Sequence, residues 1–217
     1  MRTKKDIQKI KELFLKNFDK PVTELKFNNL YELLVCVMLS AQCTDKRVNL
    51  ITPNLFKEFP DIFALSKANL SSLKILINSC SFFNNKAQNL IKMAKSVIEN
   101  FDGKIPLDAK NLQSLAGVGQ KTANVVLIEF CQANLMAVDT HVFRVSHRLN
   151  LSKAKTPELT EIDLTKAFKT DLNYLHQAMV LFGRYTCKAI KPKCDECFLR
   201  EFCNYKDNSV IIKQKFK

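Results

Sequence analysis

The chain reads Leu115-Ala116-Gly117-Val118-Gly119-Gln120-Lys121-Thr122-Ala123 at the point that most constrains its fold. Only four glycines occur in 217 residues, so two of them within three positions mark a tight backbone turn. Apolar residues recur at helical spacing on both sides of this turn. A turn that opens a helix presents backbone N–H groups at the positive end of the helix dipole, which suits a phosphate.

Two familiar phosphate-binding loops do not match this turn. The P-loop and the dinucleotide fingerprint both follow a strand and need other glycine spacings, whereas the preceding segment here reads as helix. An ordinary helix connection remains open. The alternative is a helix-hairpin-helix motif, which grips the DNA backbone without reading sequence. In that interpretation the hairpin residues Gly117, Val118, Gly119 and Thr122 contact DNA.

Composition agrees with a polyanionic partner. Lys and Arg total 34 against 21 Asp and Glu, giving a formal charge of +13 and a pI near 9.4. The alternative to a polyanionic partner is a diffusely basic surface. The longest apolar run, residues 33–39, is far too short to span a bilayer, and the N-terminus has no signal-like apolar segment. We therefore expect a soluble cytoplasmic protein without a membrane partner.

Helical periodicity runs through nearly the whole chain, and no alternating strand pattern of useful length occurs. The sequence predicts an all-α fold. Several helix ends can be predicted from capping residues. Asp45 should cap the helix that runs to Phe59, Thr156 and Pro157 should start one that ends at Phe168, and Gly183 should end the one that begins at Leu172.

Eight cysteines form two groups. Cys36, Cys43, Cys80 and Cys131 are scattered and read as small buried hydrophobes. Cys187, Cys194, Cys197 and Cys203 follow a Cys-x6-Cys-x2-Cys-x5-Cys pattern, which indicates a metal centre in a reducing compartment. Zinc sites usually pair two Cys-x2-Cys knuckles, and only one is present. Spacing alone favours an iron-sulfur cluster over zinc without excluding zinc.

Taken together, these motifs resemble the endonuclease III family of helix-hairpin-helix DNA glycosylases. The resemblance also includes residues 40–45 (Ser-Ala-Gln-Cys-Thr-Asp), 84–87 (Asn-Asn-Lys-Ala), 138–142 (Val-Asp-Thr-His-Val) and the Gly-Arg-Tyr-x-Cys that ends at Cys187. It covers essentially the whole chain. It implies a two-lobed fold. Residues 23–133 would form a six-helix barrel with the hairpin at about 108–130, and residues 1–22 plus 134–217 would form the iron-sulfur domain.

The same resemblance assigns roles to individual residues. It implies a 4Fe-4S cluster on the four C-terminal cysteines, and Lys121 and Asp139 as catalytic residues facing each other across a DNA-binding cleft. Gln42 and Phe82 would fill the gap left by a flipped base, although Ser81 stands where the family favours glycine. Lys191 and Lys193 could contact phosphates, but a charge run is usually a solvated surface.

The implied activity is base excision repair. A lysine amine can attack C1′ of a damaged nucleoside, expel the base and cleave the strand by β-elimination from the Schiff base. We expect a monomeric, nucleoid-associated DNA glycosylase and abasic-site lyase that removes oxidised pyrimidines from double-stranded DNA. The alternatives are a glycosylase for alkylated or mispaired bases, and a non-catalytic DNA-binding module with structural zinc. Without the resemblance, Lys121 reads as a solvated lysine and Asp139 as a helix N-cap.

Overall fold

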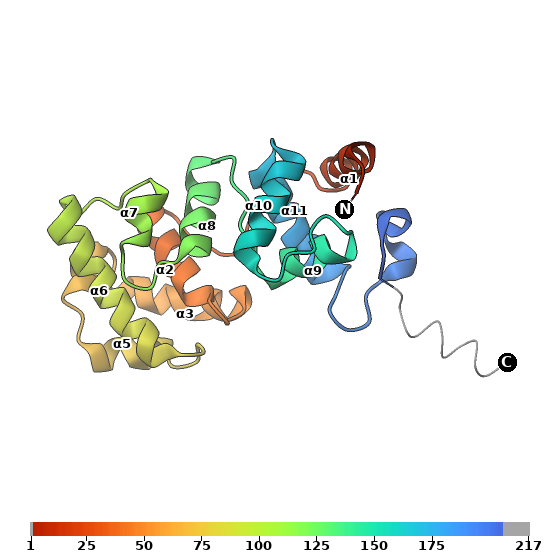
Figure 1. The fold of residues 1–217 in the computed structure, drawn as a ribbon. Helices are drawn as coiled ribbons and strands as arrows, with labels where there is room; N and C mark the ends of the chain where they lie inside the picture. Colours follow the sequence, from red (N-terminus) through yellow and green to blue (C-terminus); the bar gives the residue numbers. More distant parts are fainter. Residues whose placement is uncertain (1, 206–217) are drawn as a thin grey trace. The chain divides into compact units, whose positions relative to one another are not determined.

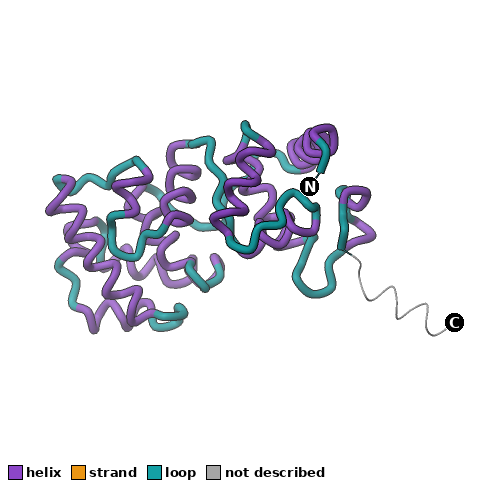
Figure 2. The backbone as a smooth tube through the Cα atoms, in the orientation of Figure 1, coloured by secondary structure: helices purple, strands orange, loops and turns teal. Residues whose placement is uncertain are grey.

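The structure is a computed structural model that describes residues 2–205. Residue 1 and residues 206–217, which fall within the predicted iron-sulfur domain, lie outside the described residues. Within residues 2–205 all regular structure is helical, as Figure 2 shows, so the predicted all-α fold is confirmed. No helix in this range is both long and apolar enough to cross a membrane.

The chain divides into two compact units. One is Thr23–Ala133, and the other combines the residues up to Val22 with those from Asn134 onward. The first unit contains seven helical segments where six were predicted, and two of the seven have only five residues. In chain order these are α2 (Leu30–Ser40), α3 (Asp45–Glu58), α4 (Ile62–Ser66), α5 (Leu70–Ile77), α6 (Phe83–Phe101), α7 (Ala109–Gln113) and α8 (Gln120–Cys131), labelled in part in Figure 1.

Helix α2 lies at the centre of the first unit. Every residue from Leu33 to Leu39 is buried, and α2 packs against α3, α6 and α8. A helix that is apolar on all sides must be surrounded by other elements. Burying a Leu or Val side chain contributes roughly 1.5–3 kcal/mol, so this helix organises the core of the unit. The segments that carry the hairpin and both loops beside it are attached to this core.

Side-chain caps determine most helix starts in this unit. The prediction that Asp45 caps α3 is wrong by one residue. Thr44 is the N-cap, and its Oγ1 accepts a hydrogen bond from the backbone N–H of Arg47 at 3.3 Å. Asp45 is instead the first helical residue, where its negative charge still favours the positive end of the dipole.

The second unit contains α1 (Lys4–Asn17), α9 (Thr140–Arg148), α10 (Pro157–Phe168) and α11 (Leu172–Tyr185), followed by 3-10 turns at Cys194–Glu196 and Arg200–Phe202. Three aromatic rings join its parts. Phe14 of α1 meets Phe182 of α11 edge to face with ring centroids 5.6 Å apart, and Phe182 lies 5.1 Å from Phe198 of the cysteine-rich tail. Such pairs add to the stabilisation from apolar burial. The N-terminal helix and the C-terminal tail therefore share one core.

Gly183 does not end α11, in contrast to the sequence prediction. The helix continues through it to Tyr185. A Cβ at this position would lie 2.8 Å from the Cβ of His141, so glycine allows α11 to approach α9 closely. The residue serves helix packing, not helix termination.

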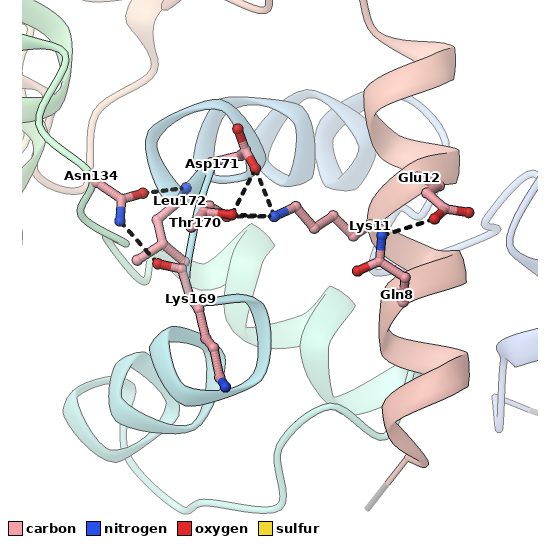
Figure 3. Close-up of polar contacts among 8 residues, drawn as sticks. All are labelled: Gln8, Lys11, Glu12, Asn134, Lys169, Thr170, Asp171 and Leu172. Atoms are coloured by element: carbon pink, nitrogen blue, oxygen red, sulfur yellow. Dashed lines mark hydrogen bonds and ion pairs between the residues drawn. The ribbon is translucent and has the colours of Figure 1, made fainter.

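A polar network fixes α1 to the start of α11 (Figure 3). Lys11 is buried, and its Nζ donates hydrogen bonds to the carbonyl (3.0 Å) and Oγ1 (2.6 Å) of Thr170 and pairs with Oδ2 of Asp171 at 2.6 Å. Asn134 adds a second link, because its amide donates to the Lys169 carbonyl and accepts from the Leu172 N–H. A buried ammonium is stable only when its donors are satisfied in this way.

Replacing Lys11 with methionine is expected to lower the free energy of unfolding by about 1–3 kcal/mol, because Thr170 and Asp171 lose their charged partner. The hydrogen bond from Lys11 is the main cause that lowers the pKa of Asp171. Stability from this carboxylate is therefore present above its ordinary pKa and lost as pH falls through the lowered pKa. The unfolding temperatures of the wild type and of Lys11→Met should therefore approach each other as the pH is lowered from 6 to 3. Lys9→Met, which removes an exposed ion pair with Glu201, is the control and should change little.

Candidate functional site: the hairpin, two loops and the cysteine cavity

The hairpin between α7 and α8 uses its two glycines differently. Gly117 has φ +79°, and a Cβ there would lie 2.9 Å from the Cβ of Asn89 on α6. A side chain at Gly117 is therefore excluded by both conformation and space. Gly119 has φ −87°, and a Cβ at this position would meet no other atom within 4 Å. The sequence interpretation that both glycines serve the tight bend is thus corrected. Gly119 instead leaves open space in front of α8.

Helix α8 begins at Gln120, directly after Gly119 and the open space beside it. The first intrahelical bond of α8 runs from the N–H of Ala123 to the carbonyl of Gly119 at 3.0 Å, so the amides of residues 120–122 precede it. Val118 differs from them. Its side chain is buried, and its N–H donates to the Leu115 carbonyl at 3.1 Å, so Val118 anchors the hairpin.

Lys121 is the second residue of α8, directly behind this turn, and its side chain is exposed. Thr122 follows it and is half-buried. Ala123 and the next five residues are buried in the unit core, which fixes the start of the helix. The helix thus presents an accessible primary amine beside backbone donors.

Asp139 is the N-cap of α9 in the second unit. Its Oδ1 accepts hydrogen bonds from the backbone N–H groups of His141 (2.9 Å) and Val142 (2.8 Å). This is the capping role that the residue type predicts. Both capping bonds use Oδ1 of the carboxylate.

Gln42 and Phe82 lie on two loops that border one cavity of about 200 Å³ in the first unit. The cavity extends along α6 past Asn89 to Gly117 of the hairpin. Both loop residues have left-handed backbone conformations, with φ values of 53° and 57°. Phe82 is 62% exposed, so it is not a core aromatic. The two loops therefore present an amide and an aromatic ring beside the hairpin.

Lys86 is a residue of this cavity to which sequence reasoning gave no role. It lies on α6, and its Nζ donates to the carbonyls of Leu39 and Ala41, both at 2.7 Å. Burial is the main cause that lowers its pKa. These carbonyls are at the end of α2, where a cation is favourable. Lys86 thus links the Gln42 loop to α6. The only sequence signal for this residue is its place in the motif at residues 84–87.

The four C-terminal cysteines line one small cavity in the second unit, together with Arg148 and Arg200. None of the eight cysteines, all of which are described, forms a disulfide. Within residues 2–205 no three His, Cys, Asp or Glu side chains converge as ligands of one metal ion. Thiolates of an iron-sulfur cluster bind separate irons and need not converge on a point. Four thiols that line one cavity form a donor set that fits a four-cysteine iron-sulfur cluster.

Two arginines of α9 hold the cysteine loop, and sequence reasoning missed both. Arg144 donates to the carbonyls of Cys187 (2.9 Å) and Gly183 (2.7 Å). Arg148 donates to the Lys188 carbonyl at 2.7 Å and to Sγ of Cys187 at 3.3 Å, and it stacks over the Tyr205 ring at 3.8 Å. Their positive charges offset the negative charge of four thiolates. Such supporting contacts tune metal sites.

Replacing Arg148 with alanine is expected to speed loss of the cluster by about tenfold to a hundredfold under a chelator, because Cys187 and its loop lose their support. The decay of visible absorption in the presence of EDTA measures this. Arg200→Ala is the matched control, since Arg200 also lines the cavity but is exposed. Equal decay in the two variants would contradict the role of Arg148.

The two loop lysines predicted to contact phosphates lie on the surface of the cysteine loop. Lys191 is exposed, with φ 49°. Lys193 is also exposed and pairs with Glu196 at 3.6 Å, which partly neutralises it. Surface pairs of this kind contribute little energy and can be exchanged for another anion.

Comparisons with known proteins agree with this geometry. Residues 35–170 match the model of the HhH-GPD superfamily of base excision DNA repair proteins, and residues 187–203 match the iron-sulfur binding domain of endonuclease III. Endonuclease III of Rickettsia felis is 44% identical over 95% of this chain and 98% of its own. That of Escherichia coli K12 is 40% identical over 86% of this chain and 89% of its own.

A solved structure has the same fold. A trapped endonuclease III–DNA covalent intermediate, in an estranged-adenine complex, superimposes with a TM-score of 0.90 at 38% identity, covering 94% of this chain and 97% of that one. The match of residues 187–203 to that iron-sulfur binding domain, together with the endonuclease III relatives, shows that the cofactor is a 4Fe-4S cluster. The chain belongs to the endonuclease III family and is a DNA glycosylase and abasic-site lyase of base excision repair.

Proposed function

We propose that this enzyme removes oxidised pyrimidines from double-stranded DNA and cleaves the resulting abasic site with Lys121 as its nucleophile. The observation that carries the proposal is the position of Lys121, exposed as the second residue of α8 behind a hairpin of backbone donors. No other exposed lysine of the described residues lies directly at this turn.

The hairpin would hold the DNA backbone. A phosphate placed before α8 receives the amides of residues 119–122 and the positive end of the helix dipole. Gly119 leaves room for this approach because nothing occupies the space in front of it. Contacts of this kind position the duplex without reading its sequence. Lys121 then lies among the residues whose amides would hold the nearest phosphate.

The chemistry follows from the two catalytic residues. The neutral amine of Lys121 attacks C1′, the C1′–N bond to the base breaks, and the base leaves with a proton. The opened sugar remains bound as a Schiff base, and loss of a C2′ proton with expulsion of the 3′ phosphate cleaves the strand. Asp139 would receive the lysine proton or stabilise positive charge on the sugar. The amides of α9 hold its Oδ1, so Oδ2 is the oxygen available for either task.

The loop residues would support extrusion of the damaged base. Flipping costs a few kcal/mol and is least costly for bases that stack poorly, as saturated pyrimidines do. Gln42 and the exposed ring of Phe82 border the cavity beside the hairpin and would occupy the gap in the duplex. Lys191 and Lys193 would add phosphate contacts on the other unit.

A panel of duplexes tests this proposal. Each carries an oxidised pyrimidine, an alkylated purine, a mispair or an abasic site, and is incubated with and without borohydride. We expect base release and a covalent adduct with the oxidised pyrimidine, and an adduct with the abasic site. Release of alkylated or mispaired bases in preference to oxidised pyrimidines would contradict the proposed substrate class.

We also propose that the enzyme acts as a monomer on cytoplasmic, nucleoid DNA. The hairpin, Lys121 and both loops all belong to one compact unit of a single chain. Sedimentation at micromolar concentration should give the mass of a single chain, near 24.9 kDa. A stable dimer would contradict the monomer.

The two hairpin glycines allow a matched test of phosphate binding. Gly117→Ala is expected to lower the free energy of unfolding by about 1–3 kcal/mol, because a Cβ there is strained and meets Asn89. Gly119→Ala should leave stability within about 1 kcal/mol of wild type. It should nevertheless weaken DNA binding, because its methyl group occupies the space proposed for a phosphate. Thermal unfolding and fluorescence anisotropy measure both effects, and unchanged DNA affinity in Gly119→Ala would contradict the binding mode.

A further inference from the structure

Cys43 and Cys80 meet in the first unit although they are far apart in the sequence. Cys43 follows α2 and Cys80 follows α5, and their Sγ atoms are 3.4 Å apart as a thiol–thiol hydrogen bond. The expectation that the four scattered cysteines are buried hydrophobes holds only for Cys36 and Cys80. Cys43 is half-buried, and Cys131 is exposed.

The pair lies at the base of the two loops beside the cavity. Cys43 directly follows Gln42, and Cys80 precedes Phe82 by two residues. Backbone bonds hold both cysteines, since the N–H of Cys43 donates to Ser40 and that of Cys80 to Ile77. Each loop also contains a left-handed residue, Gln42 and Phe82 respectively. A bond between the two sulfurs would thus join the loops at their roots.

We propose that Cys43 and Cys80 form a reversible disulfide that slows DNA cleavage by restraining the loops of Gln42 and Phe82. In a reducing compartment a disulfide of this kind is transient and regulatory, not structural. The effect on cleavage rests on the function proposed above for the two loops. Formation of the disulfide itself does not depend on that function.

The oxidant in this proposal is hydrogen peroxide. The Cys43 sulfur, which is the more accessible of the two, attacks one peroxide oxygen, the O–O bond breaks, and water leaves to give a sulfenic acid. The Cys80 sulfur then attacks the Cys43 sulfur and releases a second water. Two thiols and one peroxide therefore give one disulfide and two waters. Burial raises the pKa of the Cys80 thiol, so the more accessible Cys43 is the sulfur that meets the peroxide first.

Closing the bond changes the loop geometry. A disulfide has an S–S distance of about 2.05 Å, so the sulfurs must approach by more than 1 Å from their present 3.4 Å. Displacements of about 1 Å at residues that position a substrate can cost about a hundredfold in rate. The hydrogen bond from Lys86 to the Ala41 carbonyl links the Gln42 loop to α6 and opposes movement of that loop.

Peptide mapping tests whether the bond forms. The complete cluster-loaded enzyme is treated with a small excess of hydrogen peroxide while visible absorption reports on the cluster, and free thiols are then alkylated. Mass spectrometry should find one linked peptide pair containing Cys43 and Cys80, which dithiothreitol separates. Cys36 and Cys131 should remain free thiols after peroxide and should therefore be recovered in alkylated form. Absence of the linked pair would overturn the proposal, whatever substrate the enzyme takes.

Cleavage of abasic DNA by the same samples tests the consequence. The reduced enzyme should cleave abasic DNA, and this result tests the proposed function separately from the disulfide. Peroxide should slow the wild type by about tenfold or more, with recovery in dithiothreitol. Cys43→Ser and Cys80→Ser should fold with the same helices and keep their rate after peroxide. Equal slowing in wild type and both variants, or an unchanged rate in the cross-linked enzyme, would overturn the proposed restraint.

Discussion

Lys121→Ala is expected to abolish borohydride trapping on abasic DNA and to slow strand cleavage by about a thousandfold or more, because the variant lacks the amine that forms the Schiff base. The fold should be unchanged. Lys121 is exposed at the start of α8, and alanine is the best helix former. DNA affinity should fall only slightly, since one surface charge is lost while the hairpin amides remain.

Lys110→Ala is the matched control for that result. Lys110 is also an exposed lysine of the motif, on α7 instead of α8. This variant loses the same charge and should keep trapping and cleavage near wild-type rates. Gel analysis of trapped complexes together with single-turnover cleavage measures both. Trapping that persists in Lys121→Ala would assign the nucleophile elsewhere.

Asp139→Asn is expected to slow base release and cleavage by about a hundredfold to a thousandfold while leaving stability nearly unchanged. Asparagine cannot receive the lysine proton or carry the charge that stabilises a cationic sugar. Its side-chain oxygen can still cap α9 through His141 and Val142, because asparagine is as good an N-cap as aspartate. Single-turnover kinetics and thermal unfolding separate the two roles.

Asp139→Ala provides the comparison. It should lose the same activity and, in addition, about 1 kcal/mol of stability, because α9 loses its cap. If Asp139→Asn retains full activity, the carboxylate serves only the helix, and its catalytic assignment is wrong.

The helices were predictable where local chemistry determines them. Thr156 and Pro157 specify the start of α10, and the structure places the helix at Pro157–Phe168 as expected. The prediction for Gly183 was wrong because glycine is required there by the close approach of His141 on a neighbouring helix, and not by the end of a helix. The cap at Thr44 was missed because Thr44 and Asp45 are both good capping residues, and only the backbone conformation distinguishes them.

The candidate site was predictable where its residues are close in sequence. The hairpin, Lys121 and the cysteine pattern are local motifs, and the cysteines line one cavity. Lys86 and Arg148 could not be predicted in the same way, because both act on backbone carbonyls that the fold brings to them. Any residue offers a carbonyl, so no sequence pattern records such partners. The Cys43–Cys80 contact likewise depends on how the segments that follow α2 and α5 meet in the fold.

Mapping the covalent adduct identifies directly which amine attacks the sugar. Wild-type enzyme is trapped with borohydride on an abasic duplex, digested with protease and nuclease, and sequenced by mass spectrometry. We predict that the sugar remnant is attached to the Nζ of Lys121 in the peptide that spans Gly119–Ala123. An adduct on the N-terminal amine or on Lys86, with Lys121 unmodified, would contradict it.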